Sequence, residues 1–255
     1  MALNSNKDTV ICRLRETDST NTWIKANGDM PDGCILKVAV AQFQTSGHGQ
    51  KGNSWESADG QNLLFSILSQ PAFVNASNQF CLSEAISCAI TDALAESFPE
   101  IAGQLSIKWP NDIYWQDSKL AGILIENTLS GHTIAQSIIG AGLNVNQQSF
   151  VSDAPNPVSL YNITGRITDT DTILHSILKH FLEYYTEIRD GKTGLIHERY
   201  MQRLFRRDGF YGFRDSIGLF KARIHSVQPN GILTLQDSEG KKREYEFKQV
   251  SYILD

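Results

Sequence analysis

Three glycines and a lysine gather within residues 47–55, which read Gly-His-Gly-Gln-Lys-Gly-Asn-Ser-Trp. Glycine loses more conformational freedom on folding than any other residue, so such a cluster indicates a loop whose bare backbone must approach a ligand. Phosphate is the common ligand of loops of this kind. The glycines have the spacing G-x-G-x-x-G, but the Asn-Ser-Trp that follows is a poor helix start, and Asn53 stands where the other standard phosphate loop has lysine. The string therefore fits neither standard phosphate-loop pattern, and a flexible connection is the alternative interpretation.

Two more motifs place polar groups directly beside apolar runs. Residues 108–112 read Lys-Trp-Pro-Asn-Asp; the amide of Asn111 suits an adenine edge, and the carboxylate of Asp112 suits Mg²⁺. Lys119 precedes a strongly apolar segment, where its ammonium could meet an acyl or phosphate oxygen. The plainer alternatives are a Pro-Asn-Asp turn and a solvated lysine at a strand end.

Small residues follow another apolar run at 140–146, which read Gly-Ala-Gly-Leu-Asn-Val-Asn. Small side chains let a substrate approach the backbone closely, and Asn144 could bond a ribose hydroxyl. A bulge or tight bend is the structural alternative.

Five strings, taken together, carry a family resemblance. They span residues 19–21, 44–55, 108–112, 119–124 and 140–144. In this order and at these separations they resemble the catalytic domain of biotin protein ligases, also called biotin–acetyl-CoA-carboxylase ligases. The resemblance extends from about residue 10 to the end of the chain.

The resemblance implies an activity and a fold. Members of this family activate biotin with MgATP to biotinyl-5′-AMP and transfer it to one lysine of a biotin carboxyl carrier domain. The implied fold class is α+β: a mixed sheet with flanking helices over residues 1–207, similar to class II aminoacyl-tRNA synthetases, and an SH3-like barrel over 208–255. Only about ten residues precede the first apolar run, so the chain resembles the catalytic-only members without a DNA-binding domain.

The resemblance also implies roles for individual residues. The biotin-binding residues would be Ser19, Thr20, Asn21, Gln44, Gly47, His48, Gly49, Lys119 and Gly122. The ATP-binding residues would be His48, Gln50, Lys51, Trp55, Asn111 and Asn144. Lys119 and Asp112 would be catalytic, with Asp112 also the candidate Mg²⁺ ligand.

The loop departs from the family pattern at two positions. The family usually reads Gly-Arg-Gly-Arg where this chain has His48 and Gln50. Arginine presents a fixed fork of donors to phosphate, whereas histidine and glutamine do not. We therefore expect weaker binding of ATP or weaker retention of the adenylate.

Composition is compatible with this interpretation. The 255 residues are 41% hydrophobic and 20% charged, as in ordinary globular proteins. A formal net charge of −5 disfavours a general nucleic-acid binder. The four cysteines show no Cys-x-x-Cys spacing, and no signal peptide or membrane-length apolar run is visible. We expect a cytoplasmic protein with no DNA or membrane partner, either a monomer or a homodimer.

Apolar spacing predicts where the elements lie. Helices are expected over 20–26, 80–98, 170–189 and 193–206, and strands over 10–14, 35–43, 62–68, 105–109, 112–116, 121–129 and 133–141. Further strands are expected over 217–227, 232–236, 244–247 and 250–254, forming a small all-β module that packs on the main domain.

Two other functions remain open. The chain could act on lipoate or octanoate as a ligase or transferase of the same superfamily, or it could be a non-catalytic sensor of biotin or its adenylate. The Lys-Trp-Pro-Asn-Asp and Gly-x-Gly-x-Lys-Gly strings favour biotin, while the altered loop is the feature that favours a sensor.

Overall fold

A mixed seven-stranded sheet organises the larger part of the molecule. The structure is a computed structural model that describes residues 8–49, 54–151 and 156–254. The strand order is β1-β2-β3-β7-β6-β5-β4, in which β1 pairs with β2 in parallel and the other pairs are antiparallel. The strands are β1 (Thr9–Thr17), β2 (Leu36–Gln44), β3 (Leu63–Ser69), β4 (Leu105–Lys108), β5 (Asp112–Trp115), β6 (Ser118–Ser130) and β7 (Thr133–Leu143).

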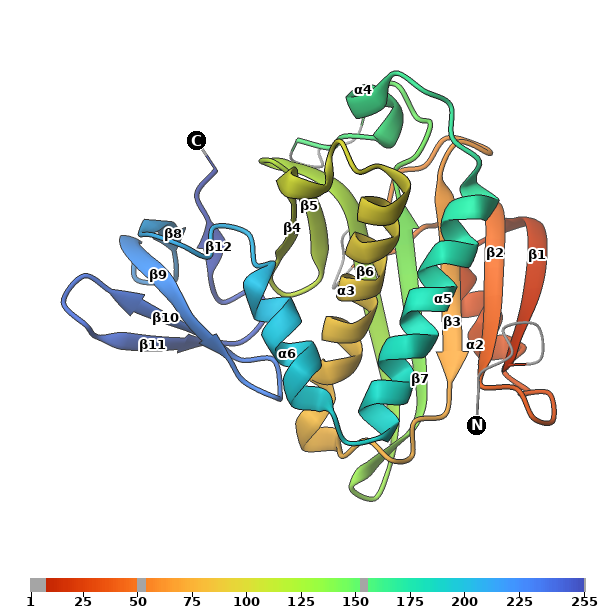
Figure 1. The fold of residues 1–255 in the computed structure, drawn as a ribbon, viewed down its shortest axis with the longest axis horizontal. Helices are drawn as coiled ribbons and strands as arrows, with labels where there is room; N and C mark the ends of the chain where they lie inside the picture. The colour runs from red at the N-terminus through yellow and green to blue at the C-terminus, as the bar shows by residue number, and fades with distance from the viewer. Residues whose placement is uncertain (1–7, 50–53, 152–155, 255) are drawn as a thin grey trace.

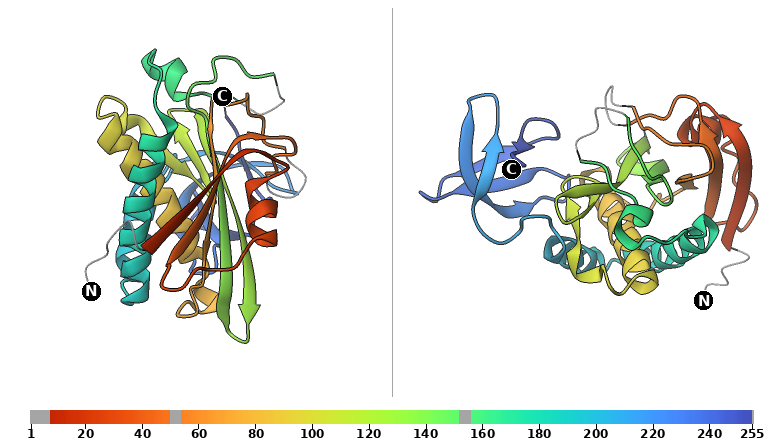
Figure 2. Two further views of the ribbon diagram at one scale, coloured as in Figure 1. Left: turned by 90° about the vertical axis from the view of Figure 1, so that its right-hand side faces the viewer. Right: turned by 90° about the horizontal axis from the view of Figure 1, so that it is seen from above.

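Helices cover the two faces of this sheet unequally. The longer helices α3 (Phe80–Ser97), α5 (Thr170–Arg189) and α6 (Thr193–Gln202) lie on one face, and the short helix α2 (Thr20–Ala26) lies on the other (Figures 1 and 2). A one-turn helix, α4 (Leu160–Thr164), stands at the end of the molecule where the loops after β7 run (Figure 1). The face that carries only α2 is therefore left partly open.

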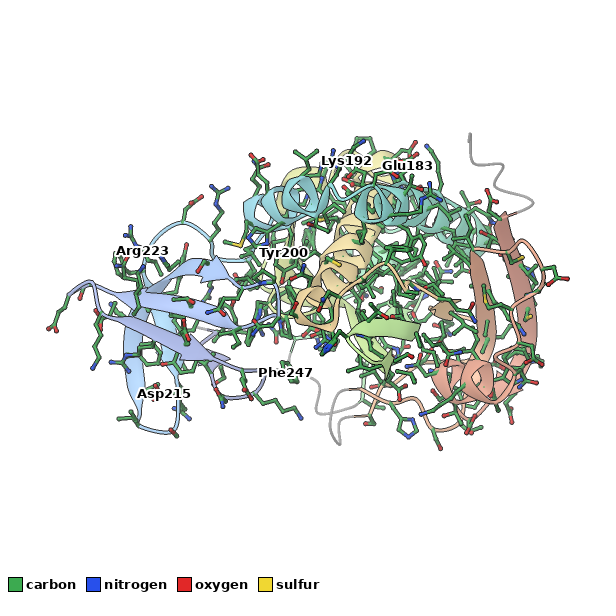
Figure 3. All side chains as sticks on the ribbon, turned by 90° about the horizontal axis from the view of Figure 1, so that it is seen from below. Glu183, Lys192, Tyr200, Asp215, Arg223 and Phe247 are labelled. Atoms are coloured by element: carbon green, nitrogen blue, oxygen red, sulfur yellow. The ribbon has the colours of Figure 1, made fainter. Side chains whose placement is uncertain are left out.

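Helix α3 is the centre of the core. Fourteen of its eighteen residues are buried, because it packs against α5, α6 and the sheet at once. Tyr200 of α6 is fully buried beside it; its ring meets Phe80 edge-on with centroids 5.6 Å apart (Figure 3). The Tyr200 hydroxyl donates to the carbonyl of Pro110 at 3.3 Å. Helix α6 thus supports the turn between β4 and β5 from behind.

The C-terminal segment forms a second sheet, which is antiparallel and five-stranded. Its order is β11-β10-β9-β8-β12, and the strands are β8 (Tyr211–Arg214), β9 (Leu219–Val227), β10 (Leu233–Asp237), β11 (Lys242–Tyr245) and β12 (Ser251–Tyr252). The α+β class with a small SH3-like C-terminal module is confirmed. The exact boundary at residues 207 and 208 stays a prediction.

The module docks on the main sheet through the turn between β9 and β10. The indole Nε1 of Trp109 donates to the carbonyl of Gly231 at 3.0 Å, and the amide of Phe80 donates to the carbonyl of Pro229 at 3.2 Å. Trp109 also packs against Phe247, which lies at the junction of the two sheets (Figure 3). The expected packing of the module on the main domain is confirmed.

Most predicted elements match the structure, and the differences are local. The helix expected to reach residue 206 ends at Gln202, and the φ of Arg206 is +53°. The prediction missed β8 and α4, and the last strands are displaced by one or two residues from their expected positions. No helix among the described residues is long and apolar enough to cross a membrane.

Candidate functional site

A cavity of about 1280 Å³ opens on the sheet face that carries α2. It begins at the start of α2, crosses β7, β6 and β5, and reaches Phe247 and Tyr252 of the C-terminal module. Small-molecule sites are concave regions of this kind, in which a few polar groups converge on a mostly apolar wall. The cavity is long enough to offer chemically different ends.

Buried hydroxyl and amide groups gather at the α2 end. The Oε1 atom of Gln44 accepts from the backbone amide of Thr20 at 2.7 Å and from its hydroxyl at 3.1 Å. The fully buried Oγ of Ser66 lies 2.7 Å from Thr20 Oγ1 and 2.6 Å from Asn21 Oδ1. These bonds fix the directions in which the polar groups face the cavity. Ser19, which also lines the cavity, is the N-terminal flanking residue of α2.

Strand pairing makes room for this polar cluster. Ser66 of β3 lies opposite Gly140 of β7, and a Cβ atom at Gly140 would collide with the side chain of Asn21. The Asn21 amide donates to Glu126 of β6 at 2.9 Å. Asn21 is therefore held from two strands at once, and its position requires glycine at 140.

A lysine–carboxylate pair lies in the middle of the cavity. Lys119 Nζ is 2.7 Å from Asp112 Oδ1, and each side chain is about 25% exposed. Asp112 opens β5 and pairs in register with Gly122 of β6, three residues after Lys119. The pair is thus anchored on neighbouring strands rather than on loops, with one charge of each sign available to a ligand.

Trp55 lies over the glycines in the floor of the cavity. A Cβ at Gly142 would collide with its indole ring, and a Cβ at Gly122 would lie 2.9 Å from it. The Trp55 amide donates to the carbonyl of Gly47 at 2.9 Å, and a Cβ at Gly47 would approach Trp55 O to 2.8 Å. The buried indole Nε1 has no hydrogen-bond partner among the described residues.

Two asparagines of the cavity, Asn111 and Asn144, differ in which side-chain atoms remain available for hydrogen bonds to a ligand. The Asn111 amide donates to the carbonyl of Ile123, so one of its donors is already used by the fold. Asn144 donates from Nδ2 to the carbonyl of Val158 at 3.1 Å, while its buried Oδ1 has no partner in the part of the chain that is described. A buried acceptor without a partner is costly, and a ligand hydroxyl or amine would satisfy it.

A second lysine, Lys108, lies at the end of the cavity that is formed with the C-terminal module. Its Nζ donates to the Tyr114 hydroxyl at 2.8 Å and lies 4.6 Å and 5.4 Å from the ring centres of Tyr114 and Tyr252. Burial lowers the pKa of Lys108, with the nearby cations Lys119 and Arg206 adding to this effect and Asp112 opposing it. No role was predicted for Lys108 from the sequence, although it is the first residue of the 108–112 motif.

The structure brings together most of the residues that the sequence predicted. Those lining the cavity are Ser19, Thr20, Asn21, Gln44, His48, Gly49, Trp55, Asn111, Asp112, Lys119, Gly122 and Asn144. Gly47 supports Trp55 from beneath, and the predicted ATP-binding residues Gln50 and Lys51 lie outside the described residues. The ligand assigned to each residue stays a prediction. Ser66, Lys108 and Tyr252 were missed; Ser66 interrupts an apolar strand, which is a signal that the sequence does contain.

Fold and cavity together define an α+β small-molecule-binding protein of the class II aminoacyl-tRNA synthetase-like type. A family model described as the biotin/lipoate A/B protein ligase family matches residues 14–144. The chain belongs to this family. The match begins within β1 and extends to the end of β7.

Individual relatives agree with this family assignment. The chain is 30% identical over 230 residues to the bifunctional ligase/repressor BirA of Bacillus subtilis, covering 86% of this chain and 66% of that one. It is 27% identical to the biotin–[acetyl-CoA-carboxylase] ligase of Paracoccus denitrificans, covering 90% of this chain and 95% of that one. Among solved structures, the biotin protein ligase of Aquifex aeolicus in complex with biotin and ATP superimposes with a TM-score of 0.76 at 26% identity, covering 94% of this chain and 97% of that chain.

Proposed function

We propose that this chain is a biotin protein ligase that adenylates biotin and transfers it to a carrier domain. One observation carries the proposal: a single cavity joins a buried amide-and-hydroxyl cluster to a lysine–carboxylate pair. The ureido ring of biotin presents two N–H donors and one carbonyl acceptor, which the cavity-lining groups of Thr20, Asn21 and Gln44 can match. Its carboxylate would then reach Lys119.

The chemistry has two steps. A carboxylate oxygen of biotin attacks the α-phosphorus of ATP, the bond from that phosphorus to the bridging oxygen breaks, and pyrophosphate leaves. The ε-amine of the carrier lysine then attacks the acyl carbon, AMP leaves, and the nitrogen loses a proton. Lys119 would stabilise the charge on the carboxylate and α-phosphate oxygens. Trp55 and the loop before it would keep water from the mixed anhydride.

Mg²⁺ fits this site as an ion that accompanies ATP. The described part of the chain holds no cluster of three histidine, cysteine or acidic residues that could hold a metal, so a preformed cage is not the expected arrangement. Mg²⁺ is commonly held by one or two carboxylates together with substrate phosphates and water, where it neutralises phosphate charge. Asp112 is the carboxylate that would hold it.

Lipoate and octanoate are the competing substrates. Both lack a ureido ring, so they would make no hydrogen bonds to the α2-end cluster, and a site built for hydrogen bonds rejects a ligand that cannot make them. Biotin is therefore favoured. The proposed macromolecular partner is a biotin carboxyl carrier domain, and the net charge of −5 gives no support to a nucleic-acid partner.

The decisive experiment combines the chain with MgATP, a carrier domain and each acid in turn. We expect biotin-dependent pyrophosphate release and a biotinyl mass increase on one carrier lysine, with neither product from lipoate or octanoate. Lys119→Ala should abolish most of the activity while still binding biotin at the α2 end. Tight biotin binding without pyrophosphate release by the unaltered chain would instead indicate a sensor.

A further inference from the structure

A buried polar network lies beside the cavity, at the point where β3 begins and β7 ends. Leu63 of β3 pairs with Leu143 of β7, so Asn62 meets the chain that leaves β7. Asn62 and Gln147 are only 4% and 3% exposed. Because buried amide groups are costly without partners, the hydrogen bonds of these two side chains specify how the neighbouring segments are arranged.

The two side-chain amides use all their nitrogen and oxygen atoms in hydrogen bonds. The Oδ1 of Asn62 accepts from the backbone amide of Val145 at 2.9 Å, and its Nδ2 donates to Gln147 Oε1 at 2.6 Å. The Nε2 of Gln147 donates to the carboxylate of Glu56 and to the carbonyl of Ser149, each at 3.0 Å. The network therefore joins the start of β3 to the segment that follows β7.

The same network holds the segment that directly follows Trp55. The backbone amide of Ala58 donates to Gln147 Oε1 at 2.9 Å. Glu56, which accepts from Gln147, also accepts from the backbone amide of Val151 at 3.1 Å. The indole of Trp55 lies over the glycines of the cavity floor, so its position depends on where these bonds hold the residues after it.

We propose that Gln147 is a positioning residue that keeps the Trp55 indole over the bound adenylate. This inference rests on the proposed function, in which Trp55 keeps water from the mixed anhydride. Gln147 is not among the described residues that line the cavity, so it acts on the ligand through the segments it binds. The network also holds Val145, directly after Asn144. Trp55 and the predicted nucleotide contact at Asn144 are thereby kept in a fixed relation.

The lifetime of the bound adenylate separates this role from a purely structural one. Gln147→Met keeps the length of the side chain but removes its four hydrogen bonds. We expect chemically synthesised biotinyl-5′-AMP to dissociate about tenfold faster from this variant, the order expected when buried hydrogen bonds are lost. With MgATP, biotin and carrier present, more pyrophosphate should be released per biotinylated carrier, while the Kd for biotin stays unchanged.

A pair of substitutions at Glu56 tests the same contact, whether or not Gln147→Met folds. Glu56 is only partly buried, so Glu56→Ala removes the acceptor of Gln147 with little disturbance of the core. This variant should also release the adenylate faster. Glu56→Gln removes the charge but keeps an oxygen that can accept from Gln147, so it should retain the slow dissociation.

Asn146→Ala is the matched control. Asn146 exchanges two hydrogen bonds of 2.9 Å with the backbone of Thr168, so its side chain anchors the segment after β7 but not the segment after Trp55. The control should lower the free energy of unfolding without changing adenylate dissociation or the pyrophosphate released per biotinylated carrier.

Two results would overturn the assignment of Gln147. One is unchanged adenylate dissociation in the folded variants at positions 147 and 56, and the other is an equal acceleration in Asn146→Ala. Failure of the unaltered chain to release pyrophosphate with MgATP and biotin would instead overturn the proposed function itself.

Discussion

Individual side chains in this protein act through partners that lie far away in the sequence. Ser66 is the clearest case, because its hydroxyl orients both Thr20 and Asn21 across 46 and 45 positions of sequence. We predict that Ser66→Ala raises the Kd for biotin about fivefold and leaves the KM for ATP unchanged, since one buried hydrogen bond contributes about 1 kcal/mol. Titration of biotin by calorimetry measures the effect.

A matched serine lies on the same strand. Ser69 is equally buried, but it lies three positions along and so faces away from the cavity. Ser69→Ala should therefore leave biotin binding unchanged. Equal weakening by both substitutions would show that Ser66 acts through the stability of β3 and not through the polar cluster.

The loop departs from the family pattern at His48, and this departure supports a second prediction about a single residue. His48 is exposed at the cavity wall, where the family pattern has arginine. His48→Arg should lower the KM for ATP and slow adenylate dissociation severalfold, because a guanidinium binds phosphate through two parallel bonds. His132→Arg, the same change at an exposed position outside the cavity, is the control. Identical adenylate release from His48→Arg and the unaltered chain would contradict the prediction.

At the scale of elements, the sequence predicted those with a local apolar pattern better than it predicted strands that form only by pairing with another strand. Helix α3 was predicted to within one residue, because its apolar spacing is a property of consecutive residues. Strand β8 has only four residues and is defined by its pairing with β9. No local sequence pattern therefore predicts it. Ser66 interrupts an apolar run, but its partners Thr20 and Asn21 depend on how the distant elements pack, so its place in the polar cluster could not be predicted from the local pattern. The gathering of Ser19, Gln44, Asp112 and Lys119 followed from the family resemblance and not from any local pattern.

The packing of α6 on α3 includes an interaction between a half-exposed histidine and a buried carboxyl group. His197 Nδ1 lies 2.7 Å from Glu84 Oε1, and the Glu84 side chain is only 5% exposed. The hydrogen bond to Glu84 raises the pKa of His197, and burial raises the pKa of Glu84. Both groups thus hold protons more tightly in the folded state. The stability contributed by His197 is complete below about pH 6.5 and is lost as the pH rises through its raised folded-state pKa.

This linkage gives a measurable pH dependence. We predict that His197→Gln lowers the free energy of unfolding at pH 6 by less than about 1 kcal/mol, because the half-exposed ring is screened by solvent. The loss should shrink by pH 9. Urea titrations of the unaltered chain and of His197→Gln at pH 6 and 9 measure the effect; a loss that is constant with pH would refute the linkage.

At the scale of the whole molecule, the C-terminal module completes the cavity that the main sheet begins. Phe247, Val250 and Tyr252 line its far end, and the β9–β10 turn fixes the module in place through Gly231. This glycine has a φ of +92°, and a Cβ there would lie 2.7 Å from the Phe80 ring. We therefore expect the position of the turn to affect both the stability of the protein and the shape of this end of the cavity.

Substitutions at two glycines of the C-terminal module distinguish an effect on stability from an effect on the shape of the cavity. Gly240 has a similar φ of +84°, but a Cβ there would meet only the end of Gln236, at 3.9 Å. Gly240→Ala should cost about 1 kcal/mol from the left-handed backbone alone and leave activity intact. Gly231→Ala carries the same backbone cost and also displaces Phe80, so it should destabilise the protein further. It should also raise the KM for ATP but not the Kd for biotin, which we propose to bind at the opposite end of the cavity. Denaturant titration with steady-state kinetics on both variants tests this; matching losses of stability and an unchanged KM for ATP would show that the module does not need this contact to shape the cavity.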